Sequence, residues 1–387
     1  MVATGVALGT TVVLHVRFGF SLLGGIWDPL LDERLQHYDF AVFWHSANAL
    51  LDGKNIYFGT GAQDSSANPP IWTVLMSPLA LLKPIFAYRL FVVLTVPVTI
   101  GYLVWMASEI GLQVGWALVG SSALLLSHPM LKTLGLGQIY PFLALGLVAA
   151  WVGDRKDRPL LTGVALGLVV AVKPLLAPVL LWPLVSRKWK VLVSTICTGA
   201  AASLVAEIVA GPGATLDWLS YVSSRRPSGA WDNSTIAGAA SRIFAANDWV
   251  EPIATVPWAL PVAYLVAIEV IILTAVAAHR DREMGLWALV AASLLASPIA
   301  WHTYLVLLGP AVLLLLARGW LAPGCLLLAL QLIPPEWSIP WEHGVAPWAP
   351  LALTFYLYVL VVHWLVLVAA SRAGQKTMPP SSEGLPT

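Results

Sequence analysis

Long apolar stretches separated by short polar connections run along the whole chain. The longest cover residues 88–107, 189–210, 253–277 and 348–370. About 20 consecutive apolar residues in a helix span the hydrocarbon core of a bilayer. A chain of 387 residues is too short to bury so many runs in a soluble core. The pattern therefore predicts an all-α polytopic membrane protein.

Helices placed on the apolar runs predict about 12 transmembrane spans. They lie near 2–26, 86–108, 112–128, 138–153, 159–172, 174–186, 189–211, 253–278, 284–300, 302–317, 319–334 and 348–370. We interpret the first as a retained span and not a cleaved signal peptide, because no basic segment precedes it. We expect the stretch 159–186 to be two short helices that meet at Lys173 and Pro174. Proline lacks an amide donor and disfavours helix at the residue before it.

The basic residues predict which connections face the cytoplasm. Eleven of the 21 lysines and arginines lie in the segments 154–158, 187–190, 279–283, at position 318 and in the tail 372–376. The positive-inside rule places these segments in the cytoplasm, which requires 159–186 to cross twice and puts both termini inside. We therefore expect one transmembrane domain over 1–370. The polar tail 371–387, rich in Pro and Ser, is predicted to be disordered and cytoplasmic.

The remaining connections are then expected on the outer face. They are 27–85, 129–137, 212–252, the turn at 300–302, and 335–347. Residues 38–52 carry aromatic and aliphatic side chains at helical spacing, which predicts an amphipathic helix along the outer interface. Tryptophans are concentrated in or beside these segments, as is typical of an interfacial belt.

Composition and motifs exclude several classes of protein. Charged residues make up only 11% of the chain, against about 25% in soluble domains. The net charge of +1 gives no basic field for nucleic acid. No Walker loop, dinucleotide glycine fingerprint, CxxC pair, GxSxG elbow or HExxH helix occurs, and we expect no cofactor. No Asp-x-Asp pair is present, so metal dependence has no support.

Polar and ionisable residues gather on the predicted outer face, where such groups at span ends are costly and tend to be functional. They are Asp39, Lys132, Gln138, Lys173, Arg225, Arg226, Asn233, Arg242, His302 and His343. One acid with several cations and histidines suits a transfer reaction with a phosphate leaving group. The carboxylate would take a hydroxyl proton and the cations would stabilise the departing phosphate.

Each candidate also has a purely structural interpretation. Asp39 suits the N-cap of the predicted helix that follows it, and Lys173 could be a lysine that extends to the interface from a helix end. His302 could be a packed interfacial histidine, and Arg242 could form a surface salt bridge. The residue types alone leave these alternatives open.

Several short motifs resemble a known family in their order and spacing. In the first outer segment they are Tyr38-Asp39-Phe40, Ala49-Leu50-Leu51-Asp52-Gly53 and Asn68-Pro69-Pro70 followed by Met76-Ser77-Pro78-Leu79. Further along are Gly137-Gln138, Lys173-Pro174, Asn233-Ser234-Thr235 with Gly238 and Arg242, and Ser297-Pro298-Ile299-Ala300-Trp301-His302. Over about 38–310 the chain resembles the polyprenol-phosphate-mannose-dependent mannosyltransferases of glycosyltransferase family 87, which have the GT-C membrane fold.

The resemblance implies an inverting glycosyl transfer on the outer face of the plasma membrane. The donor would be a sugar on a polyprenyl phosphate, most simply mannose, and the acceptor a hydroxyl of a glycolipid or lipoglycan. Asp39 matches the family's catalytic base and His302 the histidine after its Ser-Pro-x-x-Trp motif. The residues expected to bind substrate or phosphate are Lys132, Gln138, Lys173, Asn233 and Arg242. This chain has Thr303 where members often carry a second histidine, and Ser234 and Thr235 where Gln-Ser is common.

Two alternatives remain at this stage. One is an arabinofuranosyltransferase that uses a polyprenyl-phosphate pentose, since Lys173-Pro174-Leu175-Leu176 suits that branch as well. The other is a lipid or sugar transporter or flippase. Transporters commonly contain paired structural repeats, and no internal repeat is evident in this sequence.

Overall fold

The computed structural model describes residues 38–61, 66–333 and 343–374. In this part of the chain the fold is helical throughout and contains no strand, which confirms the predicted class. The predicted span 2–26 lies outside the described residues. Most of the tail 371–387, and parts of the outer segments 27–85 and 335–347, lie outside them as well.

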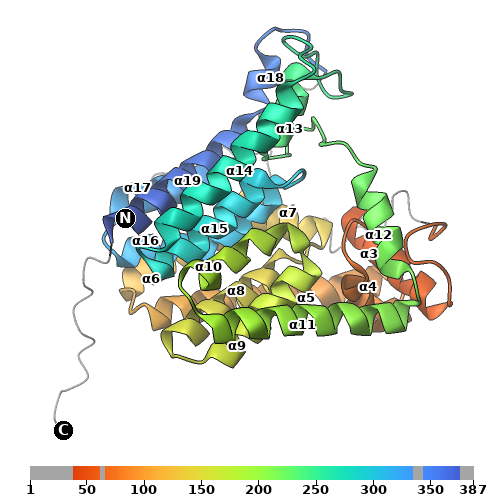
Figure 1. The fold of residues 1–387 in the computed structure, drawn as a ribbon, viewed down its shortest axis with the longest axis horizontal. Coiled ribbons are helices and arrows are strands. Elements are labelled where there is room, and N and C mark those ends of the chain that lie inside the picture. Colours follow the sequence, from red (N-terminus) through yellow and green to blue (C-terminus); the bar gives the residue numbers. More distant parts are fainter. Residues whose placement is uncertain (1–37, 62–65, 334–342, 375–387) are drawn as a thin grey trace.

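Most of the helices follow one another along the chain with short connections, and longer ones lie between α3 and α4, α12 and α13, α13 and α14, and α17 and α18 (Figure 1). They are α3 Tyr38–Leu51, α4 Pro70–Met76, α5 Pro84–Glu109, α6 Val114–Leu125, α7 His128–Leu136, α8 Tyr140–Arg155, α9 Pro159–Val172, α10 Leu181–Val185, α11 Trp189–Ala210, α12 Ala214–Ser223, α13 Ile236–Phe244, α14 Ala259–Ala278, α15 Arg282–Ala296, α16 Gly309–Ala317, α17 Leu321–Gln331, α18 Ala349–Ala352 and α19 Phe355–Ala373, with 3₁₀ segments η1 Ser77–Leu81, η2 Pro174–Leu180 and η3 His302–Leu308.

Four of the described helices, α5, α11, α14 and α19, are long and apolar enough to cross a membrane by themselves. The pair α6 and α7 meets the same test as one span bent by 48°, which gives up to five. The other apolar stretches predicted from residue 138 onward are also helical, but each is shorter or broken. The predicted number of 12 crossings therefore stays a prediction.

The break expected inside 159–186 is confirmed. Helix α9 ends at Val172, and Lys173 leaves the helical region with φ −138° and ψ 81°. Pro174 then starts a 3₁₀ segment, and the short helix α10 follows. The cause is the proline ring, which cannot donate the helical hydrogen bond and displaces the preceding residue.

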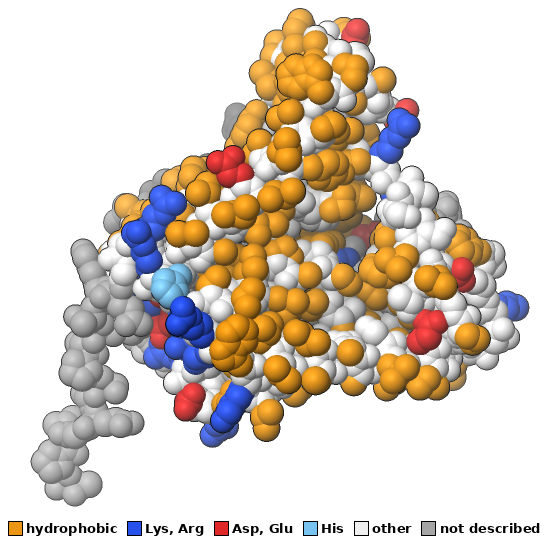
Figure 2. Space-filling view, viewed as in Figure 1, with side chains coloured by type: hydrophobic (Ala, Val, Ile, Leu, Met, Phe, Trp, Pro, Cys, Tyr) orange, Lys and Arg blue, Asp and Glu red, His pale blue; other side chains and the backbone are white. Residues whose placement is uncertain are grey.

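The basic connections meet at one end of the molecule in a network of ion pairs. The pairs are Asp154 with Lys188 and Arg282, Glu283 with Arg155 and Arg318, Asp281 with Arg318, and Glu109 with Lys156. Because the loops before α9 and after α10 both contribute, the chain between them goes away from this end and returns. In Figure 2 charged side chains gather around these helix junctions, while hydrophobic side chains cover the middle of α11 and α14.

Glycines set the closest helix packing in the bundle, between α9 and α11. A Cβ at Gly163 would lie 2.4 Å from Ser194 Cβ, and one at Gly167 would lie 2.6 Å from the Thr195 carbonyl oxygen. Two glycines four residues apart thus let the backbones approach, as small residues do in membrane helix pairs. The two helices run parallel, and both begin at the ion-pair end.

At the opposite end, the helices separate into two groups (Figure 1). Helices α13 and α18 and one end of α14 project on one side, and α3, α4 and α12 lie on the other. Figure 2 shows the surface hollowed between them. Glu207 near the end of α11 fixes α12, because its carboxylate accepts hydrogen bonds from the amides of Gly213 and Thr215 at the start of that helix.

The helix predicted over 38–52 is present as α3, but it differs from an amphipathic helix with one open face. No residue from Asp39 to Leu50 is exposed. Phe40 and Phe43 are buried against aromatic rings of neighbouring elements, among them Tyr88 and Trp72. The helix is therefore enclosed by protein on most sides, a feature that periodicity alone does not reveal.

Candidate active site

Asp39 and Gln138, which are 99 positions apart in the sequence, meet at the start of α3. Gln138 Nε2 donates a hydrogen bond of 2.5 Å to Asp39 Oδ2. Asp39 lies in the first turn of α3, where the helix dipole favours a carboxylate. Because the amide is neutral, it orients the carboxylate without cancelling its charge.

The turn between α7 and α8 holds Gln138 in place. Gly137 has φ +68° and follows α7 as its left-handed cap, while the Gln138 amide donates to the Thr133 carbonyl at 2.9 Å. This arrangement is a Schellman motif, in which glycine is preferred because it has no Cβ. A Cβ at Gly137 would also lie 2.7 Å from Phe40 Cβ. Glycine thus serves two purposes, since it allows the turn and lets α3 approach Gln138.

Lys173 is a buried cation at the break after α9, only 8% exposed. Its Nζ donates to Asn68 Oδ1 at 2.6 Å and lies 5.4 Å from the ring centroid of Tyr304. No carboxylate lies within ion-pair distance of Lys173 among the described residues. Both partners are neutral, and burying an ammonium group without a counter-charge is costly. The site is therefore suited to an anion supplied by a ligand.

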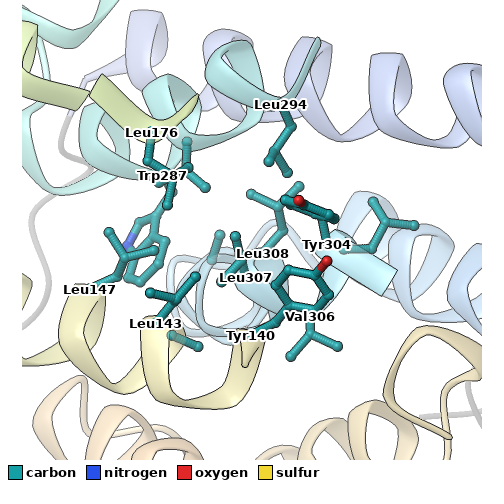
Figure 3. Close-up of a cluster of buried hydrophobic side chains, with 14 of the residues drawn as sticks. Tyr140, Leu143, Leu147, Leu176, Trp287, Leu294, Tyr304, Val306, Leu307 and Leu308 are labelled. Atoms are coloured by element: carbon teal, nitrogen blue, oxygen red, sulfur yellow. The ribbon is translucent and has the colours of Figure 1, made fainter. Parts of the chain in front are cut away.

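Two buried tyrosines lie between the acid and the cation. The rings of Tyr140 and Tyr304 are 4.2 Å apart, and the charge of Asp39 acts on Tyr140. Figure 3 shows the two rings side by side at the edge of an apolar cluster that includes Leu143 and Trp287. Asp39 and Lys173 therefore lie near the same aromatic pair, at the edge of the hydrophobic core. The sequence indicated neither tyrosine.

The segment with Trp301 and His302 is held by backbone pairing with the loop before α13. Ser234 N donates to Ala300 O at 2.7 Å, and His302 N donates to Asp232 O at 2.8 Å. The Asn233 side chain joins the two segments, because it accepts a hydrogen bond from Ala300 N and donates one to Ser228 O. Asn233 is completely buried by these contacts. Its hydrogen bonds hold the loop before α13 against the segment that leads to His302.

The His302 side chain is 3% exposed and lies in a stack of aromatic rings. Its ring centroid is 4.8 Å from that of Tyr356 and 5.4 Å from that of Trp231. Neither ring nitrogen has a hydrogen-bond partner among the described residues. Lys132 and His128 on α7 lie close enough for their charges to act on His302. An imidazole buried without a partner can accept or donate a hydrogen bond to a ligand.

Arg242, by contrast, is saturated by the protein. It is fully buried, and its guanidinium donates to the carbonyls of Gly229, Ala230 and Asn233 and to the Thr354 hydroxyl. Burial lowers the pKa of Arg242 to about 10. Four of its five N–H groups point to fixed acceptors, so the side chain ties the loop before α13 to α19.

An apolar groove lies directly beside the Lys173 break. It has a volume of about 210 Å³ and runs between α4, α9, α11 and α12. Pro69 and Pro174 form part of its wall, and they directly follow Asn68 and Lys173. The remaining lining residues are mostly small or apolar, as at Gly199 and Ala206 on α11. An apolar chain could lie in this groove with its polar end at Lys173.

The structure thus links five of the seven predicted site residues, Asp39, Gln138, Lys173, Lys132 and His302. Gln138 bonds Asp39, two tyrosines connect Asp39 to Lys173, and Lys132 lies near His302, which is two positions before Tyr304. Asn233 and Arg242 instead bond backbone groups of the loop before α13 and of the segment that leads to His302. Sequence reasoning missed Tyr140, Tyr304 and the pairing of Asn68 with Lys173, although Asn68 belongs to one of the quoted motifs. In the described ranges no group of three or more His, Cys, Asp or Glu side chains could hold a metal ion.

The fold and the site together define a membrane protein with one polar site at the end of an apolar bundle. The model of glycosyltransferase family 87 matches residues 67–298, which is more than half of the chain. The chain therefore belongs to glycosyltransferase family 87 and is a membrane glycosyltransferase. Asp39 and His302 lie outside the matched region, on either side of it. No curated protein matches the sequence significantly.

Proposed function

We propose that this protein transfers a sugar, most simply mannose, from a polyprenyl-phosphate donor to a hydroxyl of a glycolipid or lipoglycan. The reaction would take place on the outer face of the plasma membrane and would invert the anomeric centre. Family membership supports glycosyl transfer, and the geometry of the site supports the lipid-phosphate donor.

The observation that carries the proposal is the buried Lys173 ammonium without a carboxylate partner. In the protein alone this charge is only partly compensated by the Asn68 amide and the Tyr304 ring. A phosphate diester placed there would supply the missing negative charge. The apolar groove beside Lys173 would accept the first part of the prenyl chain, so one ligand would satisfy both features.

Asp39 is proposed as the general base. Its carboxylate would take the proton of the acceptor hydroxyl as that oxygen attacks the anomeric carbon of the donor sugar. The bond between the anomeric carbon and the phosphate oxygen would break, and its electron pair would leave with the polyprenyl phosphate. Because phosphate is a good leaving group, positive charge near it is sufficient, and Lys173 would provide this charge.

The other predicted residues would assist these two. Gln138 would orient Asp39, as its hydrogen bond in the structure suits it to do. His302, whose ring nitrogens lack partners among the described residues, would contact the sugar or the acceptor together with Lys132. Asn233 and Arg242 would act on the site by positioning the segment that carries His302.

The proposed topology has 12 crossings, both termini in the cytoplasm and the site outside. It is supported by the convergence of the basic loops at the end opposite Asp39 and Lys173. A thiol-labelling experiment tests the orientation. Single cysteines are placed at positions 156 and 230. In intact cells an impermeant reagent should label only position 230, and labelling at 156 alone would show the opposite orientation.

A transfer assay with the purified protein tests the activity directly. Polyprenyl-phosphate mannose and polyprenyl-phosphate arabinose are offered separately with a membrane glycolipid extract as acceptor. Transfer from the mannose donor supports the proposal, and transfer only from the arabinose donor would establish the pentosyltransferase instead. Without transfer from either donor, the proposed donor class would have to be abandoned.

A further inference from the structure

A second cavity lies at the ion-pair end of the molecule, far from the candidate active site. It has a volume of about 420 Å³ and is formed by the α8–α9 loop and the α10–α11 loop, at residues 154–159 and 187–191. Helix α9 separates it from Lys173, and its 14 residues correspond to about 21 Å of helix. The sugar-transfer chemistry proposed above uses no residue of this cavity.

Positive charge predominates in the cavity. Arg158, Arg187, Lys188 and Lys190 line it, with Asp154 and Asp157 as the acids. Asp154 is already paired with Lys188 and with Arg282. The side chains of Arg158, Arg187 and Lys190 are exposed and form no ion pair with any described residue. Among the described residues, these three cations and the Asp157 carboxylate are the lining charges without an ion pair, which leaves an excess of positive charge for an anion from outside the protein.

Two helix N-termini add to this positive potential. Helices α9 and α11 run parallel, and both begin at the cavity. Their N-cap residues Arg158 and Lys188 provide no capping hydrogen bond from a side chain. Backbone amides at such ends favour an anion, and here the two ends lie together because Gly163 and Gly167 let the helices pack closely.

The backbone of both loops is also unusual in the same way. Asp157 has φ +50° and Arg187 has φ +54°, although this left-handed region favours glycine. Each is followed directly by the basic residue that caps the next helix. The two loops therefore hold Arg158 and Lys188 in the same position relative to the helix that each precedes. Arg187 keeps its strained backbone conformation at a position where its charged side chain lines the cavity.

Apolar side chains next to the cavity indicate what kind of anion would bind. Trp189 is 57% exposed and lines the cavity. Leu160, which follows the lining residue Pro159 on α9, is 71% exposed. Exposed apolar residues continue along both helices, at Val164 on α9 and at Val193 and Ile196 on α11. A charged cavity that leads onto apolar helix surface matches a molecule with an anionic head and acyl chains.

We propose that this cavity is a binding site for an anionic phospholipid of the adjacent leaflet. Its phosphate would lie among Arg158, Arg187 and Lys190, and its acyl chains would run along α9 and α11. The chemistry shared with other ligands is the phosphate group, and the apolar surroundings favour the lipid over a free phosphate.

Native mass spectrometry of the full-length protein in detergent tests the proposal. Phosphatidylglycerol and phosphatidylcholine with identical acyl chains are titrated separately. The variant R158Q/R187Q is compared with the control R280Q/R372Q, which removes the same charge from exposed residues at the same end that do not line the cavity. A basic side chain near an anionic lipid contributes about fivefold to binding, so R158Q/R187Q should bind phosphatidylglycerol about 25-fold more weakly.

The expected result is preference for phosphatidylglycerol over phosphatidylcholine, lost in R158Q/R187Q and kept in the control. Equal binding by both variants would overturn the proposal, and so would equal affinity for the two lipids. Displacement of the lipid by an excess of inorganic phosphate alone would show that the site takes free phosphate. Thermal unfolding in neutral detergent verifies folding, and K190Q serves as a milder variant with the same expected direction.

Discussion

Replacing Lys173 by methionine separates a ligand-binding lysine from a structural one. Methionine keeps most of the side-chain volume but removes the buried charge and its hydrogen bond to Asn68. A hydrogen bond to a charged group contributes about 1.5–3 kcal/mol. The KM for the lipid-phosphate donor should therefore rise about 10- to 150-fold if Lys173 makes one such bond to the phosphate. The kcat at saturating donor should fall by a smaller factor, because Lys173 also stabilises the departing phosphate.

Stability should respond in the opposite direction from an ordinary core mutation. The variant removes a charge that is 8% exposed and has no carboxylate partner in the described chain, which relieves a desolvation cost of several kcal/mol. The Asn68 oxygen then loses its donor, at a cost of about 1–3 kcal/mol. The two effects oppose each other, so the melting temperature of the donor-free protein should stay the same or rise.

The assay combines initial-rate kinetics at varied donor concentration with thermal unfolding in the absence of donor. Lys83→Met, at an exposed lysine before α5, is the matched control and should change neither value. Lys173→Arg should retain a large part of the donor affinity, because it retains the charge. An unchanged KM in Lys173→Met, or a large loss of stability, would refute the assignment and leave Lys173 as a structural residue.

Three further substitutions test the rest of the site. Asp39→Asn should reduce kcat by about 10²–10⁴-fold with donor KM and melting temperature preserved, and a rate near that of the wild type would exclude Asp39 as the base. Gly137→Ala places a Cβ 2.7 Å from Phe40 Cβ and strains a positive φ. It should lower the free energy of unfolding by at least about 1 kcal/mol and kcat by about tenfold or more. Unchanged kinetics would show that the contact of α3 with Gln138 is not needed. Arg242→Met leaves several buried acceptors without donors, so the melting temperature should fall. The donor KM of the folded fraction should rise less than in Lys173→Met, because Arg242 acts only through the His302 segment. A large rise in KM with unchanged stability would favour phosphate binding by Arg242 instead.

The sequence by itself determined the helical class, most helix positions and the break at Lys173 and Pro174. These features depend on local properties, namely the length of apolar runs and the geometry of proline, and both act within a few residues. It also predicted that the basic loops lie on the cytoplasmic side of the membrane, which stays a prediction. In the structure these loops meet at one end of the molecule, where Asp154 and Glu283 pair with basic residues of other loops.

Only the tertiary structure decided what each polar residue of the site contacts. Lys173 and Asn68 are 105 residues apart and Asp39 and Gln138 are 99 apart, so no local pattern pairs them. An arginine or asparagine in a polar loop can bind a ligand or satisfy backbone carbonyls, and the residue type is the same in both cases. The folded chain surrounds Arg242 with carbonyl oxygens and places Asn233 between the Ser228 carbonyl and the Ala300 amide. Both side chains therefore satisfy backbone groups that would be costly to bury unpaired.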